Sequence, residues 1–186
     1  MMGISTGGPK TLRRVFGSLP RLNAAVVLVQ HMPKFINQSV CRTLDALTDM
    51  DVVLAENNME IKEGCVYLAP SELHTELVKN TRLRLRSGPK VCFVCPSVDV
   101  AMKSASTVPG KLIGVIMTGM GKDGAEGIAK LKTLGARTFA QDEATSIIWG
   151  MPAAAIETGK IDEVLSPEQI QKKLVSLVGC LSAART

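Results

Sequence analysis

Three side chains of the types used in nucleophilic catalysis stand at separate turns of the sequence: the hydroxyl of Ser5, the imidazole of His31 and the carboxylate of Asp123. An imidazole that removes the hydroxyl proton makes the oxygen a nucleophile, and a carboxylate can hold the imidazole in place. The chain order of such a trio does not matter, because the trio is defined by its geometry. The residue types therefore predict acyl-transfer hydrolysis, provided that the fold brings the three turns together.

Glycines beside these residues offer main-chain donors for the same chemistry. Gly7 and Gly8 follow the serine closely, and two further glycines flank Met120. Glycine permits tight turns that expose backbone N–H groups, and such groups stabilise the negative charge that develops on an attacked carbonyl oxygen. We expect the amides of Gly7, Gly8 and Met120 to face one cavity.

Each of the three residues also has an ordinary structural interpretation. Ser5 and Asp123 can cap the helices that follow them, and His31 can be a hydrogen-bonded side chain of the core. His31 is, however, one of two histidines in the chain, and all three residues stand at the ends of predicted strands. This coincidence favours the catalytic interpretation over three unrelated ones.

The elements that must position these residues are predicted by alternating apolar runs and helical patterns. Continuous apolar runs are typical of parallel strands buried on both faces, and here they cover residues 24–29, 52–55, 65–69, 112–117 and 136–140. Helical patterns cover residues 9–17, 37–47, 98–106, 124–134 and 167–177. We predict a three-layer α/β/α sandwich with a mostly parallel sheet. Ligands bind beyond the carboxyl ends of such strands, where Ser5, His31 and Asp123 would meet.

One segment departs from this alternation. Residues 76–86 alternate with a period of two around Asn80 and Thr81, which predicts an antiparallel hairpin with one solvated face at the edge of the sheet. The hairpin carries a stripe of arginines, but aromatic residues make up 3% of the chain. Because stacking platforms are missing, we do not expect nucleic-acid binding.

Composition bounds the class of protein. The chain has 186 residues, of which 46% are hydrophobic and 21% charged, so we expect one folded domain over residues 1–186. No apolar run reaches the roughly 20 residues of a membrane span, and no signal-peptide pattern is visible. Five cysteines without framework spacing indicate a reducing, cytoplasmic setting. Only four residues precede Ser5, so we expect the first strand to be truncated.

A dinucleotide-binding module is the main alternative. Residues 119–124 satisfy the G-x-G-x-x-G pattern, and Asp142 stands near the end of the next predicted strand, where a ribose-binding acid would lie. Against it, Asp123 would place a negative charge beside a pyrophosphate. The sequence also has no second mononucleotide-binding half after this motif. These two arguments weigh against the alternative but leave it open.

Two further groups of residues resemble metal or redox sites. Cys92 and Cys95 form a C-x-x-C pair, but no second pair accompanies it, so we predict ordinary thiols. His74 stands near Glu72 and Glu76 in a predicted loop, where such a group is usually a polar rim. No metal site is expected from either group.

Several segments resemble those of the CheB family of chemotaxis protein-glutamate methylesterases, in order and over almost the whole chain. The similar segments lie at residues 5–8, 30–33, 67–70, 96–100, 118–124, 141–144 and 150–152. The resemblance implies that Ser5 is the nucleophile, His31 the general base and Asp123 its partner. It also implies that Thr6 lines the site and that the Met120 N–H contributes to the oxyanion hole.

The resemblance implies hydrolysis of glutamate γ-methyl esters on the cytoplasmic helices of chemoreceptors, with release of methanol. Deamidation of receptor glutamines is an implied second activity. No organic cofactor, metal, nucleic acid or membrane insertion is implied. Residues 1–186 contain no receiver domain of the kind that links the family to a phosphorelay, so we expect such a domain to act in cis or in trans.

Some positions depart from the family's usual pattern. Val94 and Cys95 stand where the family usually has basic residues such as His-Arg, and Ile36, Asn37 and Val40 also differ. We expect these positions to border the substrate groove. The receptor sequence that is recognised is therefore expected to differ, whereas the chemistry is expected to be kept.

Overall fold

The computed structural model describes residues 1–106 and 112–181, which form nine strands, six α-helices and one 3-10 helix. The strands are β1 (Met2–Ile4), β2 (Val26–Gln30), β3 (Asp51–Leu54), β4 (Cys65–Leu68), β5 (His74–Val78), β6 (Arg82–Arg86), β7 (Ile113–Ile116), β8 (Arg137–Gln141) and β9 (Glu163–Leu165). The α-helices are α1 (Gly8–Phe16), α2 (Asn37–Asp45), α3 (Val98–Lys103), α4 (Ala125–Thr133), α5 (Gly150–Glu157) and α6 (Pro167–Val178). The 3-10 helix is η1 (Lys34–Ile36).

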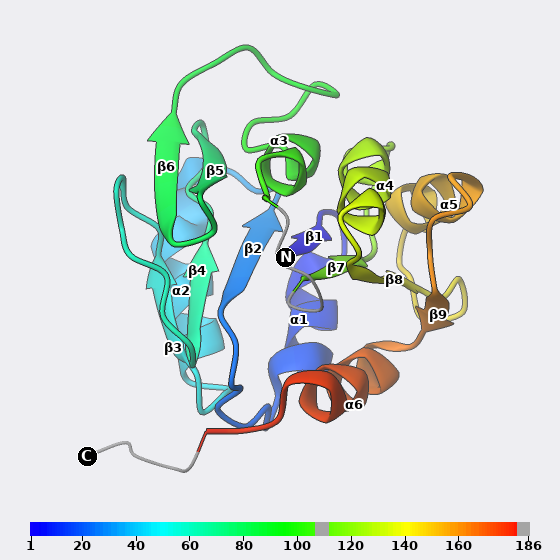
Figure 1. The fold of residues 1–186 in the computed structure, drawn as a ribbon, viewed down its shortest axis with the longest axis horizontal. Coiled ribbons are helices and arrows are strands. Elements are labelled where there is room, and N and C mark those ends of the chain that lie inside the picture. Colours follow the sequence, from blue (N-terminus) through cyan, green and yellow to red (C-terminus); the bar gives the residue numbers. More distant parts are fainter. Residues whose placement is uncertain (107–111, 182–186) are drawn as a thin grey trace.

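Seven strands form a parallel sheet in the order β3-β4-β2-β1-β7-β8-β9. The chain starts in the middle of this sheet, with β2, β4 and β3 on one side of β1 and β7, β8 and β9 on the other (Figure 1). The strand order therefore reverses beside β1. Such a switch point is where open α/β sheets bind ligands.

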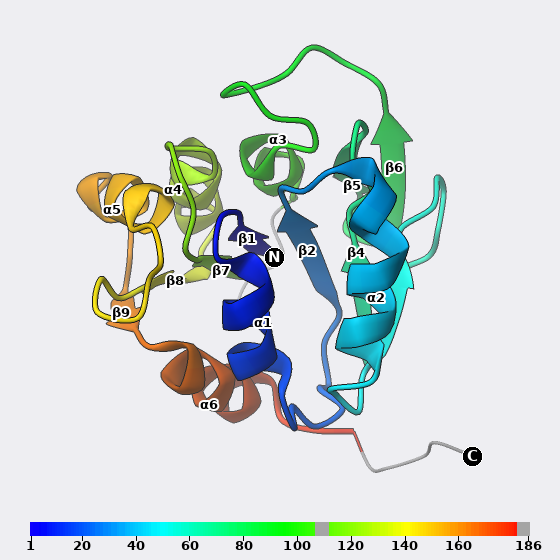
Figure 2. The ribbon, with the colours of Figure 1, turned by 180° about the vertical axis from the view of Figure 1, so that it is seen from behind.

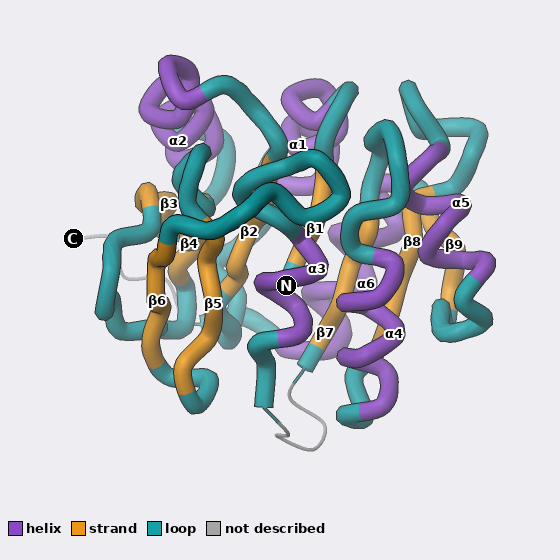
Figure 3. Tube along the Cα trace, turned by 90° about the horizontal axis from the view of Figure 1, so that it is seen from above, coloured by secondary structure: helices purple, strands orange, loops and turns teal. Residues whose placement is uncertain are grey.

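Helices cover both faces of the sheet (Figures 2 and 3). On one face α1 and α6 bury Leu12, Phe16 and Ile170 in a core shared with strand side chains. On the other face α3 and α4 bury Met102 and Ile128 in a second core. Continuous apolar strands with a hydrophobic layer on each side confirm the predicted three-layer α/β fold.

The predicted hairpin is present, but its placement differs from the expectation. β5 and β6 pair antiparallel as a separate two-stranded sheet and do not extend the edge of the parallel sheet. Leu77 and Leu83 of the hairpin are buried in the same core as Val27 and Tyr67. The hairpin thus lies over the sheet face beside α3, because its apolar side chains need a hydrophobic surface to cover them.

Two of the three arginines in the hairpin share one carboxylate of the same hairpin. Arg84 and Arg86 both bind the carboxylate of Glu76, at 2.5 and 2.6 Å. Burial alone would raise the pKa of Glu76, but the hydrogen bonds from Arg86 and Arg84 outweigh it and lower that pKa.

Within the described residues, no helix combines the length and apolar character required to cross a bilayer.

Candidate active site

Ser5 lies directly beyond the carboxyl end of the central strand. The register pairs Ile4 of β1 with Gln30 of β2, so the next residues, Ser5 and His31, stand side by side. The His31 N–H donates to the Ile4 carbonyl at 3.0 Å, and the Ser5 N–H donates to the Thr118 carbonyl at 2.9 Å. Ser5 is therefore held between the turns that follow β2 and β7. Its hydroxyl makes no hydrogen bond to any residue that the structure describes, so the hydroxyl rotor is uncommitted.

His31 and Asp123 form a direct pair. His31 Nε2 lies 2.9 Å from Asp123 Oδ2, and the two side chains are 10% and 3% exposed. Because an ionised carboxylate only accepts, Nε2 carries the proton and Nδ1 is left as an acceptor. Nδ1 has no partner among residues 1–106 and 112–181, so it is available to the neighbouring Ser5 hydroxyl.

The amino end of α3 holds the Asp123 carboxylate. Oδ1 accepts from the Ser97 hydroxyl at 2.7 Å and from the Asp99 N–H at 3.1 Å, and Oδ2 accepts from the Val98 N–H at 2.6 Å. Burial alone would raise the pKa of Asp123, but the hydrogen bonds from His31, Ser97 and these amides outweigh it and lower that pKa. Asp123 therefore does not cap its own helix α4, whose cap is Gly124.

Gly3 allows α3 to come close enough for these bonds. A Cβ at Gly3 would lie 2.7 Å from Val98 Cγ2, so any side chain there would push the helix away from β1. Gly119 has a similar role on the other side of the site. A Cβ at Gly119 would lie 2.7 Å from Ser5 Cβ, so the glycine brings the turn of Met120 against the serine.

Of the three amides expected to face the site, one already donates a hydrogen bond within the protein and two do not. Gly8 N–H donates to the Ser5 carbonyl at 2.9 Å, so the expectation that it faces the cavity is wrong. The Gly7 and Met120 amides have no acceptor within the described part of the chain. Gly7 adopts φ +85, which glycine adopts without strain. Two donors beside Ser5 thus remain for an oxyanion.

Thr6 is exposed beside the serine, and its carbonyl accepts from the Thr118 hydroxyl at 2.9 Å. Thr118 Oγ1 in turn accepts from the Ile148 N–H at 3.0 Å. This fully buried threonine joins the turn that follows β1 to the loop that precedes α5. Our sequence reasoning gave Thr118 no role of its own.

Gln30 is a second residue that the sequence analysis missed. Its Nε2 donates to the Ser5 carbonyl at 3.1 Å and to the His31 carbonyl at 2.8 Å. One buried amide group therefore ties the turn of the candidate nucleophile to the turn of the candidate base. A polar residue ending the apolar run of β2 was the signal that could have revealed it.

His74 is a buried support for the start of α3 and does not belong to a polar rim. It begins β5, is buried, and accepts from the Ser97 N–H at Nδ1 while Nε2 lies 2.9 Å from the Pro89 carbonyl. Glu72 instead pairs with Lys34 on the surface. The predicted loop position of His74 is therefore wrong, and both of its ring nitrogens are already engaged.

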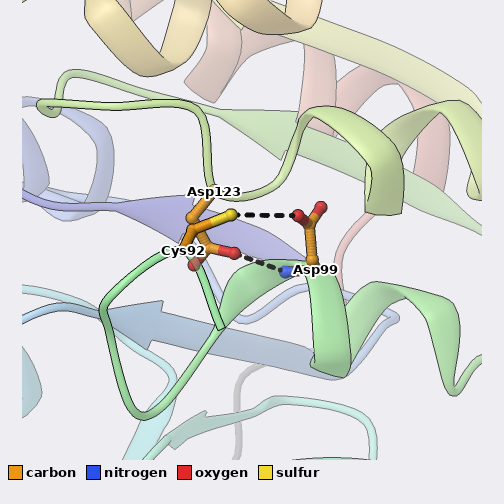
Figure 4. Close-up of side chains that lie close together, drawn as sticks. All are labelled: Cys92, Asp99 and Asp123. Atoms are coloured by element: carbon orange, nitrogen blue, oxygen red, sulfur yellow. Dashed lines mark hydrogen bonds between the residues drawn. The ribbon is translucent and has the colours of Figure 1, made fainter. Parts of the chain in front are cut away.

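One group of possible metal ligands lies next to the site. The Cys92 thiol and the carboxylates of Asp99 and Asp123 place ligand atoms within 4.8 Å of one another (Figure 4). Burial, followed by the charges of Asp123 and Asp99, raises the pKa of the Cys92 thiol. Burial also raises the pKa of Asp99, although the Gly127 N–H acts in the opposite direction. A protonated thiol and a carboxylate whose oxygens already accept several donors do not fit a cation.

The Gly119–Gly124 loop does not have the features of a dinucleotide site. Asp123 is buried inside that loop. Asp142 Oδ1 accepts from the Thr145 N–H at 3.0 Å and also binds the Thr145 hydroxyl. The acid expected to reach a ribose is thus occupied in its own turn, and the alternative is not favoured.

Fold and site together define a doubly covered parallel α/β domain with a buried His–Asp pair beside an uncommitted serine at the switch point. Residues 1–174 match the family model described as CheB methylesterase, and the chain belongs to this family. The resemblance noted in the sequence motifs is confirmed.

Relatives and a solved structure agree with this assignment. A protein-glutamate methylesterase/protein-glutamine glutaminase of Pyrococcus horikoshii is 44% identical over 94% of this chain and 49% of its own length. The one of Photorhabdus laumondii is 37% identical over 99% of this chain and 54% of its own length. The crystal structure of the Thermotoga maritima CheB methylesterase catalytic domain matches with a TM-score of 0.91 and 39% identity, over 95% of this chain and 96% of that chain. The chain thus spans about half the length of these curated relatives.

Proposed function

We propose that residues 1–186 are the catalytic domain of a protein-glutamate methylesterase that uses Ser5 as nucleophile, His31 as general base and Asp123 as the group that orients it. The observation that carries this proposal is the His31–Asp123 pair, which leaves Nδ1 as an acceptor in the turn next to that of Ser5. Thr6 lines the site, and the Met120 and Gly7 amides stabilise the oxyanion. No metal or organic cofactor takes part in the proposed steps.

The reaction follows from these positions. His31 Nδ1 takes the Ser5 proton while Ser5 Oγ attacks the ester carbonyl, and the two amides hold the resulting oxyanion. The tetrahedral intermediate collapses, and His31 returns the proton to the leaving methoxide, which departs as methanol. A water molecule deprotonated by His31 then hydrolyses the acyl-enzyme to glutamate and free Ser5. With a glutamine substrate the leaving group is ammonia.

The proposed substrates are methyl-esterified glutamates on the cytoplasmic helices of chemoreceptors, and glutamines at such positions. The curated relatives carry both activities in their names. The net charge of +5 suits an acidic protein partner. A receiver domain in cis or in trans and a cytoplasmic location belong to the same proposal, and the five free thiols favour a reducing compartment.

Methanol release from methylated receptor membranes tests the proposal. Ser5→Ala should lower the rate by at least about 10³-fold, because the acyl-enzyme can no longer form. Ser39→Ala, which changes an exposed serine of α2, serves as the matched control and should release methanol at the wild-type rate. Equal release by Ser5→Ala and the control would rule out the proposed nucleophile.

A further inference from the structure

Large apolar side chains stand exposed on loops around the candidate catalytic residues. Phe35 is 85% exposed, Phe93 94% and Met120 78%. Ile147 and Ile148 are also exposed. We call these five residues the apolar rim. A contiguous group of exposed large hydrophobic side chains on a folded domain marks an interaction site more often than single scattered ones do.

Ile147 and Ile148 are tied to the site by specific contacts. Ile147 lies against the turn after Ser5, since a Cβ at Gly7 would be 2.8 Å from Ile147 Cβ. The Ile148 carbonyl accepts from the Gly119 N–H at 2.9 Å. The rim therefore adjoins the serine on the side of β7 and α5.

Met120 lies in the turn that Gly119 brings against Ser5, and Phe35 and Phe93 approach from the side of β2 and α3. Phe35 lies in η1, which follows His31 closely in the chain. Phe93 directly follows Cys92, whose thiol lies within 4.8 Å of the Asp123 carboxylate. The segment between β6 and α3 that carries Phe93 runs on the side of the molecule to which the β2 arrowhead points (Figure 1).

The turn at Phe93 holds the ring outward. Cys92 and Phe93 have φ angles of 50 and 67, and Val91 and Val94 exchange two backbone hydrogen bonds of 3.0 Å around them. Two successive non-glycine residues with positive φ are costly, and such costs concentrate at functional sites. The exposure of Phe93 is thus imposed by a closed two-residue turn.

Charge around the rim favours an acidic occupant. Lys122 is exposed in the same turn as Asp123 and forms no ion pair with any residue that the structure describes. Lys34 is exposed next to Phe35, where it pairs with Glu72 at 3.0 Å. A groove of about 420 Å³, lined by Lys34, Asn37, Leu54 and Ser71 among others, opens beside η1. Apolar side chains with flanking lysines suit an amphipathic acidic helix.

We propose that the apolar rim is the docking surface for the amphipathic, acidic helix that carries the esterified glutamate, and that Phe35 and Phe93 set which helices are accepted. The inference rests on the proposed function, because the occupant must present an ester to Ser5 while it covers the rim. Apolar side chains three or four residues from that glutamate lie on the same helix face and pack on the two rings. Acidic side chains of the helix bind Lys122.

Two substrates separate docking from chemistry. Phe35→Ala and Phe93→Ala, singly and together, are compared with wild type on methylated receptor membranes and on a minimal ester, N-acetyl-glutamate α-amide γ-methyl ester. The double variant should lose about tenfold or more in kcat/KM on the receptor, as expected for aromatic anchors. Its kcat/KM on the minimal ester should stay within about twofold, because neither ring touches the reacting atoms. Leu177→Ala, an exposed leucine of α6 at the other end of the fold (Figure 1), is the matched control.

Binding without turnover keeps the test independent of the proposed chemistry. Cosedimentation of the Ser5→Ala chain with receptor membranes should weaken about tenfold when both phenylalanines are also replaced. Unchanged cosedimentation and unchanged receptor kcat/KM would overturn the docking proposal, as would an equal loss on both esters. A concentration-dependent dimer that the double variant abolishes, with receptor binding intact, would assign the rim to self-association instead. Absence of methanol release by wild type from both esters would instead count against the proposed function.

Discussion

The imidazole of His31 meets the carboxylate of Asp123 through Nε2, at 2.9 Å, so the ring nitrogen that remains for Ser5 is Nδ1. In the familiar serine-protease arrangement the aspartate holds Nδ1 and Nε2 faces the serine. The proposed relay would therefore use the ring in the opposite sense. Asp123 reaches the ring from the turn between β7 and α4, where the amino end of α3 holds its carboxylate, and Ser5 stands at the end of β1.

The tautomer of His31 is the first prediction. Because Nε2 donates to Asp123, ¹⁵N NMR at neutral pH should show a protonated Nε2 and an unprotonated Nδ1 for the catalytic ring. Asp123→Asn should lower kcat by about 10⁴-fold, since an amide can hold the opposite tautomer. Asp49→Asn, at an exposed position, should leave kcat unchanged. An Nδ1-protonated ring in the wild type would contradict the assigned roles of the two nitrogens.

Acid stability tests the hydrogen bonds around Asp123. Its pKa is lowered in the folded state, so its contribution to stability is present above the unfolded-state pKa and is lost as the pH falls through the folded-state pKa. Ser97→Ala removes the hydroxyl that donates at 2.7 Å, so the folded-state pKa should rise. The midpoint of acid unfolding should move to higher pH, and the neutral-pH free energy of unfolding should fall by about 1–3 kcal/mol.

Circular dichroism over a pH series measures both quantities. Ser176→Ala is the control, because that exposed hydroxyl binds only the Lys173 carbonyl of its own helix. An unchanged acid midpoint in Ser97→Ala would show that this hydroxyl does not stabilise the ionised Asp123.

Asp99 should behave in the opposite way. Burial and the Asp123 charge raise its pKa above the unfolded-state value, so its favourable contribution is full below the unfolded-state pKa and is lost as the pH rises through the folded-state pKa. Asp99→Asn keeps the oxygen that accepts from the Gly127 N–H but removes the charge. Its free energy of unfolding relative to wild type should increase from pH 4 to pH 8 in urea titrations. A constant difference over that range would contradict the raised pKa.

Gln30 should affect the reaction rate because it fixes the relative positions of the turns that carry Ser5 and His31. Gln30→Met removes both donated hydrogen bonds at nearly constant volume. The Ser5 carbonyl keeps the Gly8 N–H as a donor, whereas the His31 carbonyl is left without a donor among the described residues, at a cost of about 1–3 kcal/mol. We expect a lower kcat on the minimal ester with little change in KM, because neither bond touches substrate. Gln38→Met, on the exposed face of α2, should have no effect on either constant. If the Gln30→Met variant keeps the wild-type kcat, Gln30 does not position the site.

Much of the fold was predictable from the sequence, because the local sequence patterns agree with the elements that form. Five strands appear within two residues of their predicted ends. α5 escaped prediction because its residues are uniformly small or apolar and begin with Gly150, so they show no helical period. β9 has three residues, too few to establish a period of two.

The candidate catalytic residues were predictable for a different reason from their supports. Ser5, His31 and Asp123 carry reactive groups at strand ends, which the order of apolar runs reveals. Ser97 reaches Asp123 from the start of α3 and His74 reaches Ser97 from β5. Such contacts join residues more than twenty positions apart, and nothing local in the sequence reports them.

The strand that precedes Ser5 lies in the middle of the sheet, bonded to β2 on one side and to β7 on the other. Freeing this serine would require separating two ladders in the most protected part of the molecule, whereas loops at a periphery can open at little cost. Heat inactivation and global melting should therefore be a single event in this protein. The same embedding means that a partly unfolded chain would lose the geometry around Ser5 together with the centre of the sheet.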